Sequence, residues 1–217
     1  MKKTKKSFII LLVLILNYSC SSEESDSSQQ TSNFYALTVG NSWDYKYYLN
    51  DANTNNFLPT PVTETVDITA TVVIDNETYY NFKHIVSGNN GSYSMLPDNG
   101  ERNFTLRDSS GYLIDEIGTI KYNNSSYDEY FVDYITDYGD FAYYLSLTDT
   151  ADNVTTNAGS FTCYDNNYYF KDSNGNLSNS LDHIYREDGK GEVLSTMSYM
   201  SDQSPFAEKR LENYSIQ

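Results

Sequence analysis

Few side chains in this sequence have the type and spacing that chemistry requires. The 217 residues include two cysteines, Cys20 and Cys163, and two histidines, His84 and His183, beside 30 acidic residues. A thiol can be modified or act as a nucleophile, an imidazole can transfer protons, and paired carboxylates can cleave a glycosidic bond. The sequence has no G-x-S-x-G, H-E-x-x-H, phosphate-loop or G-x-G-x-x-G motif. We therefore expect no enzyme, no cofactor and no metal site, and only the context of Cys20 indicates a specific reaction.

Cys20 follows a segment that has the parts of a secretory signal peptide. Four lysines lie within the first six residues, and an unbroken apolar run follows from Phe8 to Leu16. The run is too short to cross a bilayer, which takes roughly 20 residues, but it fits the apolar region of a signal peptide. Ser19 supplies a small residue before the cleavage site. Residues 1–19 are therefore predicted to be a cleaved leader.

The same segment resembles the lipobox of bacterial lipoproteins, in which a peptidase cuts just before a cysteine that already carries lipid. Leu16 lies four positions before Cys20, where the strict pattern has three, and the boxes of Bacteroidetes-type bacteria are looser. The resemblance implies that Cys20 carries a diacylglyceryl group and an amide-linked acyl chain such as palmitate. Two or more acyl chains anchor a protein stably, whereas one chain binds only marginally. The alternative is an ordinary signal peptide with an incidental cysteine.

Residues 20–33 follow as a polar tether. The stretch "SSEESDSSQQTSN" has no aromatic or aliphatic residue, so it cannot bury apolar surface and is expected to be flexible. Its acids Glu23, Glu24 and Asp26 resemble the export signal that sends Bacteroidetes lipoproteins to the outer leaflet, and the alternative is a solvated linker. The expected location is the outer membrane, with the lipid-anchored domain facing the cell surface.

The charge balance limits the partners. The net charge is −16, and cleavage of the leader would leave 10 basic residues against 30 acidic ones. Such a surface repels nucleic acid, whose binding depends on neutralising phosphates, and it disfavours anionic lipid headgroups. The expected partners are the membrane, through the lipid anchor, and a glycan or an envelope protein.

Residues 34–217 have the composition and periodicity of a single antiparallel β domain. They are rich in Tyr, Thr and Val, with frequent Asn, Asp and Gly between the apolar runs. Val62–Ile74 alternates between apolar and polar residues, interrupted on the apolar face only by Glu64, and Asp75-Asn76 turns the chain into a second strand over 77–86. We expect an all-β fold with little helix: a meander, a sandwich or a curled half-barrel-like sheet.

The remaining strands are expected between turn signals such as "SGNNG", "DSSG" and "EDGKG". Residues 148–159 contain too few apolar side chains for a core element and are expected to form a loop. The other strand candidates are 43–49, 93–96, 103–107, 112–116, 127–135, 141–147, 160–171, 181–186, 193–200 and 209–216.

Several segments resemble a broad group of uncharacterised Bacteroidetes lipoproteins of flavobacterial type. "FYALTVGNSWDYKYY" over 34–48 resembles their opening strand, with its Gly-x-x-Trp-x-Tyr motif. "VVIDNETYYNFK" resembles their following hairpin, and "DHIYREDGKGEVLSTMSYM" over 182–200 resembles their late turn and strand. The resemblance implies a β-rich domain on a lipid anchor and no known catalytic residues.

The opening strand offers the first candidate ligand residues. Trp43, Tyr45 and Tyr47 are expected to point to one side of the strand. Burial in the core is the simplest role for rings of this size, and stacking against a ligand is the alternative.

The 22 tyrosines offer a second candidate surface. Because neighbours in a strand face opposite ways, each tyrosine pair is expected to send one ring to each side of the sheet. A row of outward rings among acids and amides could stack sugars and bind their hydroxyls, and the alternative is cross-strand aromatic pairing on a wet sheet. The pairs are Tyr47-Tyr48, Tyr79-Tyr80, Tyr143-Tyr144 and Tyr168-Tyr169.

Two short motifs remain. Asp172, Asn174 and Asn176 begin like a calcium loop, but Leu177 replaces the required glycine, so a hairpin turn is expected. Asp149-Thr150-Ala151 resembles Bacteroidetes O-glycosylation sites, which makes Thr150 a candidate for modification.

Together the sequence predicts a non-catalytic binding module, with a glycan as its most specific candidate ligand. The alternative is a structural or assembly component of the cell envelope. A deep pocket with aromatic lining would favour the first, and a flat exposed apolar patch would favour the second.

Overall fold

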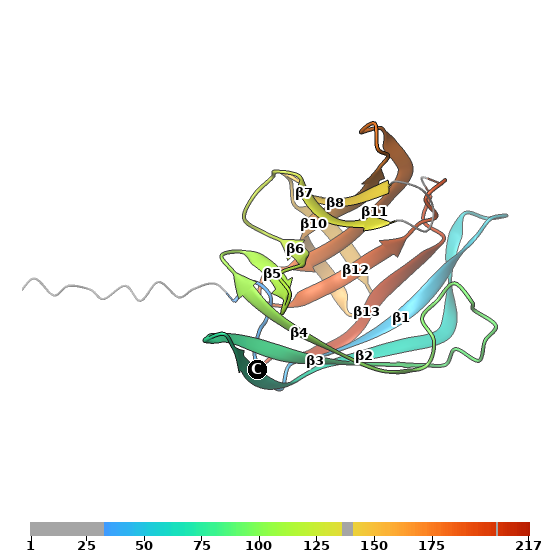
Figure 1. The fold of residues 1–217 in the computed structure, drawn as a ribbon. Helices are drawn as coiled ribbons and strands as arrows, with labels where there is room; N and C mark the ends of the chain where they lie inside the picture. The colour runs from blue at the N-terminus through green and yellow to red at the C-terminus, as the bar shows by residue number, and fades with distance from the viewer. Residues whose placement is uncertain (1–32, 136–140, 203) are drawn as a thin grey trace, which may run out of the picture. The chain divides into compact units, whose positions relative to one another are not determined.

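The computed structural model describes residues 33–135, 141–202 and 204–217 as strands, turns and loops (Figure 1). The expected leader, Cys20 and all but the last residue of the expected tether lie outside the described residues. The described segments contain no helix, and so none that is long and apolar enough to cross a membrane. The predicted all-β class is confirmed.

The described residues form 13 strands. In order they are β1 (Ser42–Asp51), β2 (Asn56–Ile74), β3 (Glu77–Ser87), β4 (Gly100–Ser109), β5 (Tyr112–Asp115), β6 (Ile120–Asn123), β7 (Tyr130–Ile135), β8 (Phe141–Leu147), β9 (Asp152–Thr156), β10 (Gly159–Lys171), β11 (Leu177–Glu187), β12 (Gly191–Met197) and β13 (Ala207–Ser215).

One antiparallel meander connects almost all of these strands. The order across the sheet is β6-β5-β4-β3-β2-β1-β13-β12-β11-β10-β8-β7, and β9 pairs with the first half of β10. The pairing of β1 with β13 joins the two ends of the described chain in the middle of the sheet. Figure 1 shows the sheet curling round on itself, so that β5 and β6 approach β10. Of the predicted arrangements, the curled sheet is the one that forms.

Side chains join β6, at one edge of the curled sheet, to β10 near the other edge. The Asn123 backbone N–H of β6 donates to Asn166 Oδ1 of β10 at 2.7 Å, and Asn166 Nδ2 donates to the Asn123 carbonyl at 2.8 Å. The Tyr122 hydroxyl donates to the Tyr164 carbonyl at 2.6 Å. Among the described residues no backbone ladder joins β6 to β7 or β10. The result is a nearly closed, barrel-like sheet with β7 as a free edge.

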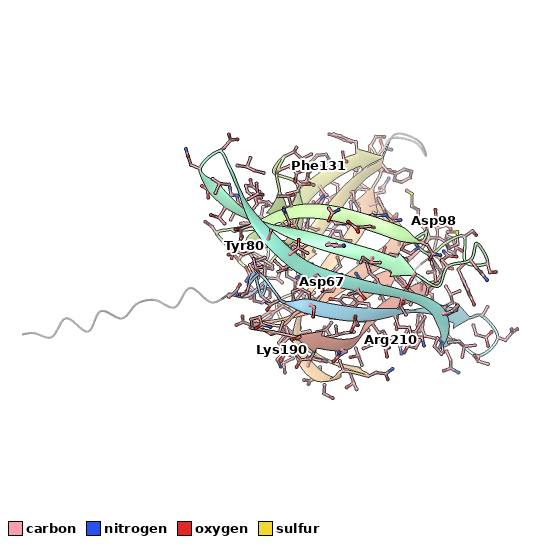
Figure 2. The ribbon with its side chains drawn as sticks, turned by 90° about the horizontal axis from the view of Figure 1, so that it is seen from below. Asp67, Tyr80, Asp98, Phe131, Lys190 and Arg210 are labelled. Atoms are coloured by element: carbon pink, nitrogen blue, oxygen red, sulfur yellow. The ribbon has the colours of Figure 1, made fainter. Side chains whose placement is uncertain are left out.

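The predicted hairpin of β2 and β3 is confirmed. Asp75 and Asn76 have φ values of 51° and 65°, as the two central positions of a type I′ turn require. The buried face predicted for Val62–Ile74 ends at Ile68, however, because a bulge lies between Ile68 and Ala70. Val72 is 37% exposed. The tip of the hairpin therefore extends beyond the core, and Figure 2 shows it from below, beside the labelled Tyr80 of β3.

The first described residues cover one open end of the barrel-like sheet. Phe34 and Tyr35 are buried among the core side chains. The Phe34 carbonyl accepts from the Gly189 N–H at 3.1 Å, and the Tyr35 hydroxyl donates to the Gly111 carbonyl at 2.6 Å. The described chain therefore begins at the end of the sheet that holds the β11–β12 turn.

The strand predicted over 93–96 is wrong. These residues lie in the loop between β3 and β4, where the Asn89 amide donates to the carbonyls of Tyr93, Leu96 and Pro97. Leu96 packs against the core from this loop, so its apolar side chain does not indicate a strand. A side-chain amide organises this loop, and the pattern of apolar residues does not reveal it.

The loop predicted over 148–159 is wrong in its second half, which forms β9, and β6 was not predicted. β9 pairs with the start of β10, and the Thr155 and Ser160 hydroxyls lie 3.0 Å apart across the pair. Only Val154 of β9 packs against the core. A strand held mainly by its backbone ladder needs no apolar face, so its composition resembles that of a loop.

Replacing Asn166 by alanine tests the closure of the sheet. The change leaves the buried N–H and C=O of Asn123 unpaired, so the free energy of unfolding is expected to fall by roughly 2–4 kcal/mol. Urea unfolding followed by the fluorescence of Trp43, the only tryptophan, measures it. Asn167→Ala changes the same residue type on the opposite face and is expected to cost less than about 1 kcal/mol. Equal losses for the two variants would contradict this account.

Candidate functional site

The three candidate ligand residues of β1 lie inside the sheet. Trp43, Tyr45 and Tyr47 are all buried on one face, as their spacing predicts. Trp43 Nε1 donates to the Lys190 carbonyl at 2.5 Å, and the Tyr45 hydroxyl donates to the Glu192 carbonyl at 2.9 Å. Their polar atoms are thus already engaged within the fold. We call the face of the sheet that carries these rings the inner face.

Five charged or titratable side chains form a layer on the inner face, next to these rings. Lys209 Nζ lies 3.4 Å from a Glu64 oxygen and 2.9 Å from a Glu192 oxygen. His84 Nδ1 lies 2.7 Å from the other Glu64 oxygen, and an Arg186 nitrogen lies 3.7 Å from Glu192. We call these five residues the ionic layer. They come from five different strands, so the layer joins β2 and β3 to β11, β12 and β13.

Three members of the ionic layer, Glu64, Glu192 and Lys209, have pKa values shifted in the direction that favours their charged forms. Burial alone would raise the pKa of Glu64, but the Lys209 ammonium and hydrogen bonds from His84 and Tyr47 hold that pKa well below its ordinary value. Burial would likewise raise the pKa of Glu192, and Lys209 with Arg186 lowers it. The two carboxylates in turn raise the pKa of Lys209 well above its ordinary value, although burial opposes them.

The cavity beside this layer is too small for a ligand. It measures about 70 Å³ and lies among Trp43, Tyr45, Phe82 and the ionic layer. Pockets for small molecules measure roughly 300–1,000 Å³, so this one has room for a few water molecules at most. Gly191 shows how tightly the wall is packed, since an added Cβ would lie 3.0 Å from Trp43 Nε1. This part of the inner face therefore supports the fold, and the cavity among these described residues is too small for a ligand.

We call the opposite side of the sheet the outer face. The tyrosine pairs of β8 and β10 each place one ring on this face, as predicted. Tyr168 of β10 is buried and its hydroxyl donates to the Lys121 carbonyl of β6, while its ring packs 5.3 Å from Tyr143 of β8. Their neighbours Tyr144 and Tyr169 lie on the other side, where their rings stack 6.2 Å apart at an interplanar angle of 14°. For these two pairs the predicted division of rings between the faces is confirmed.

A pocket of about 660 Å³ lies beside Tyr169. It forms where β11 bulges away from β10, because Tyr169 pairs with Leu181 and Lys171 pairs with Leu177, leaving Ser178–Ser180 without regular partners. We call it the outer-face pocket. Its lining residues are Glu129, Asn167, Tyr169, Lys171, Leu177, Ser178, Asn179, Ser180, Leu181, His183 and Pro205.

The cations of the outer-face pocket already have anionic partners. Lys171 Nζ lies 2.5 and 2.6 Å from the two oxygens of Glu129, and it also sits 4.7 Å from the centre of the Tyr144 ring. His183 Nδ1 lies 2.7 Å from an oxygen of Asp165. The pocket therefore presents two neutralised ion pairs.

The pKa shifts of Glu129 and His183 agree with this pairing. Burial would raise the pKa of Glu129, but hydrogen bonds from Lys171 and Tyr169 lower it. The hydrogen bond to Asp165 raises the pKa of His183, against the opposing effect of burial. Burial, however, raises the pKa of Asp165, although the hydrogen bond from His183 opposes it, so the charged form is favoured for Glu129 and His183 and disfavoured for Asp165.

Three oxygen atoms at this pocket lack a hydrogen-bond partner among the described residues. They are Asn167 Oδ1, Ser178 Oγ and Ser180 Oγ, and each is shielded from solvent. Ser180 as a whole is only 1% exposed. A buried polar atom without a partner costs about 1–3 kcal/mol, so a water molecule or a ligand group that reached these oxygens would stabilise the pocket.

The other candidate residues lie elsewhere. Cys163 is buried in β10, and burial raises its thiol pKa to about 12. Thr150 is exposed in the bend before β9. Asp172 begins the predicted hairpin turn between β10 and β11, where its carboxylate accepts hydrogen bonds from the backbone of Asn174 and Asn176.

Sequence reasoning found Tyr169 but missed Glu129 and Ser180. Glu129 lies 42 residues from Lys171, and nothing local connects the two. The run "LSNS" over 177–180 is the only local sequence signal for this pocket. Its serines and asparagine interrupt the apolar alternation expected of a central strand, and such an interruption can indicate a β-bulge. The sequence signal for the ionic layer is Glu64, which is the only charged residue on the apolar face predicted for Val62–Ile74.

Neither a protein-family model nor a curated protein matches this chain. One solved structure, from Bacteroides fragilis and provisionally described as an exported protein with a YMCC-like fold, is 12% identical with a TM-score of 0.50. That match covers 85% of this chain and 99% of the other. The two proteins share a fold. A second solved structure, provisionally described as a lipoprotein of Parabacteroides distasonis, is 14% identical with a TM-score of 0.43, over 85% of this chain and 99% of that one.

The fold is the property that the comparison with the Bacteroides fragilis protein carries over. At such low identity no residue role transfers, so the site has to be argued from the contacts of this chain.

Replacing Lys209 by methionine tests the ionic layer. The variant leaves the buried carboxylates of Glu64 and Glu192 without their ammonium, and the free energy of unfolding at pH 7 is expected to fall by roughly 3–5 kcal/mol. Both carboxyl pKa values are held below the ordinary 4.5, so their stabilisation is present above that pH and is lost as the pH falls through the folded-state values. The difference between wild type and variant is therefore expected to shrink below pH 4.5.

The matched control for this variant is Lys83→Met. Lys83 pairs with Glu101 at 3.0 Å, but the two side chains are 34% and 50% exposed. Such surface pairs contribute about 0–1 kcal/mol. A loss at Lys209 no larger than that at Lys83 would show that the layer does not stabilise the fold.

Proposed function

We propose that this chain is a lipid-anchored lipoprotein of the outer membrane, facing the cell surface, whose β domain binds glycans without cleaving them. The lipid anchor would be attached at Cys20, and the polar tether would carry the domain. The fold shared with an exported protein of Bacteroides fragilis supports an envelope location. The glycan assignment rests on the outer-face pocket.

The composition of the outer-face pocket is the observation that carries the proposal. It combines an aromatic ring, Tyr169, with the apolar side chains of Leu177, Leu181 and Pro205. It also holds hydroxyl and amide oxygens, including that of Ser180, that have no partner among the described residues. A sugar ring has apolar C–H faces and a rim of hydroxyls, so it can stack on the first set and hydrogen-bond to the second. The volume of about 660 Å³ falls within the range of small-molecule sites.

The position of the pocket suits a ligand outside the cell. The described chain begins beside Gly189, just beyond the last residue of β11, whereas the pocket lies along the first half of that strand. Eleven residues of β-strand span about 33 Å. Figure 1 shows the β10–β11 turn at the top, well away from the point where the described chain begins. A domain held through its N-terminal end would therefore present the pocket away from its attachment.

The carboxylates near the pocket support binding rather than hydrolysis. A glycosidase needs a pair of carboxyl groups on either side of the scissile bond. Glu129 is the only carboxylate among the described lining residues, and Lys171 and Tyr169 both bind it. Asp165, behind the pocket, is bound to His183.

An assembly role is the second candidate, and the β7 edge favours it. Phe131 and Tyr134 on β7 are 47% and 69% exposed, and β7 pairs with β8 on one side only. Figure 2 shows the labelled Phe131 far across the domain from Lys190 of the β11–β12 turn. Unpaired strand edges of this kind can add a strand from another chain.

Replacing Cys20 by serine tests the anchor. Cells fed a tagged fatty acid are expected to label the wild type and Cys163→Ala, and to leave Cys20→Ser unlabelled and outside the membrane fraction. Added protease is expected to remove the wild-type domain from intact cells. Label on Cys20→Ser, or a mature wild-type chain that retains residues 1–19, would refute the lipoprotein assignment.

Replacing Tyr169 by alanine tests the glycan site. Any saccharide that binds the wild type on a glycan array is expected to bind Tyr169→Ala about tenfold more weakly by isothermal titration, which corresponds to about 1.4 kcal/mol. Tyr127→Ala removes a 65% exposed ring outside the pocket and is expected to bind as the wild type does. If no saccharide binds, or if Tyr169→Ala binds fully, the outer-face pocket is not a glycan site and the assembly role at β7 gains support.

A further inference from the structure

We infer that the outer-face pocket selects a neutral oligosaccharide over an acidic one. The inference rests on the proposed glycan-binding function and adds the ligand's charge and length. It follows from three features of the described residues: how the charges are paired, which atoms remain unpaired, and how the pocket continues along β11.

The charges of the pocket leave no free cation for an acidic sugar. Both oxygens of Glu129 bind Lys171 Nζ, at 2.5 and 2.6 Å, and this nitrogen also lies over the rings of Tyr144 and Tyr169. His183 is bound to Asp165. A uronic acid would have to displace one of these carboxylates to gain an ion pair. The acidic surface of the whole chain, with net charge −16, would also repel it.

The unpaired atoms of the pocket instead suit sugar hydroxyls. Ser178 Oγ and Ser180 Oγ can each donate and accept a hydrogen bond, and Asn167 Oδ1 accepts. A hydroxyl does both as well, so a sugar can match all three, whereas a carboxylate only accepts. Ser180 is the most informative of them because it is only 1% exposed and still lacks a partner among the described residues.

A second hollow continues from the pocket. It measures about 480 Å³ and shares Leu177, Ser178 and Asn179 with the outer-face pocket. Asp172 lies in its wall, where hydrogen bonds from Asn176 lower its pKa and keep the carboxylate charged. The two hollows together are long enough for more than one sugar unit, and the charge of Asp172 again disfavours an acidic one.

Isothermal titration of the purified mature protein with two matched series tests the inference. The first series holds neutral gluco-, manno- and galacto-oligosaccharides of two to six units, and the second holds oligogalacturonates of the same lengths. The wild type is expected to bind at least one neutral series, with a Kd that falls as the chain lengthens. The oligogalacturonates are expected to bind at least tenfold more weakly or not at all.

Two variants identify the physical cause. Ser180→Ala is expected to weaken neutral binding about tenfold, while Ser173→Ala, in the exposed β10–β11 turn, leaves it unchanged. Glu129→Gln removes the carboxylate that neutralises Lys171, and it is expected to strengthen oligogalacturonate binding at least fivefold. Circular dichroism confirms that each variant is folded.

The outcomes separate the inference from the function on which it rests. If oligogalacturonates bind the wild type as tightly as the neutral series, or if Glu129→Gln gives no gain for them, charge selection is refuted while glycan binding stands. If the Kd does not change with chain length, the second hollow takes no part. If neither series binds, both the inference and the proposed glycan function fall.

Discussion

The rest of the structure depends on one largely buried ammonium. Lys209 of β13 holds Glu64 of β2 and Glu192 of β12, on either side of the β1–β13 pair that joins the ends of the described chain. A slip of β13 by one residue would turn Lys209 to the outer face and leave both carboxylates unpaired in the interior. The ionic layer therefore favours a single register for the strand pair that closes the meander. It also fills part of the interior with paired charges, and the proposed ligand site is accordingly on the outer face.

The closure of the sheet decides which side chains that outer face receives. Asn166 and Tyr168 of β10 point inward and bind the backbone of β6. Strand alternation then places Asn167, Tyr169 and Lys171 on the outside, where the pocket lies. Alternate residues of β10 thus have the structural and the candidate functional roles. The bulge of β11 adds the depth, because three residues of β11 lie opposite one residue of β10 between the pairs Tyr169–Leu181 and Lys171–Leu177.

Patterns of neighbouring residues predicted the parts of the fold that are determined by interactions between neighbouring residues. The Asp75-Asn76 turn and the opposite faces of Tyr168 and Tyr169 follow from rules that involve neighbouring residues only, and both are confirmed. The meeting of Asn123 with Asn166, 43 residues apart, follows from the curl of the sheet and has no local signature. No local signature defines the outer-face pocket either, because the bulge of β11 is defined only by its register with β10. Bulges and side-chain closures therefore limit what the sequence predicts about the site.

A pocket with neutralised charges on a strongly acidic domain has consequences for recognition. Under the proposed function, long-range attraction would not steer a neutral sugar to the site, so its association would gain nothing from the field of the protein. Affinity then has to come from contacts, and single hydrogen bonds contribute only about 0.5–1.5 kcal/mol each. The affinity of such a site would increase most for an oligosaccharide with several units, because each added unit makes further contacts after the first unit has bound. The second hollow beside Leu177 has the position that this argument requires, next to the pocket along the same bulged strand.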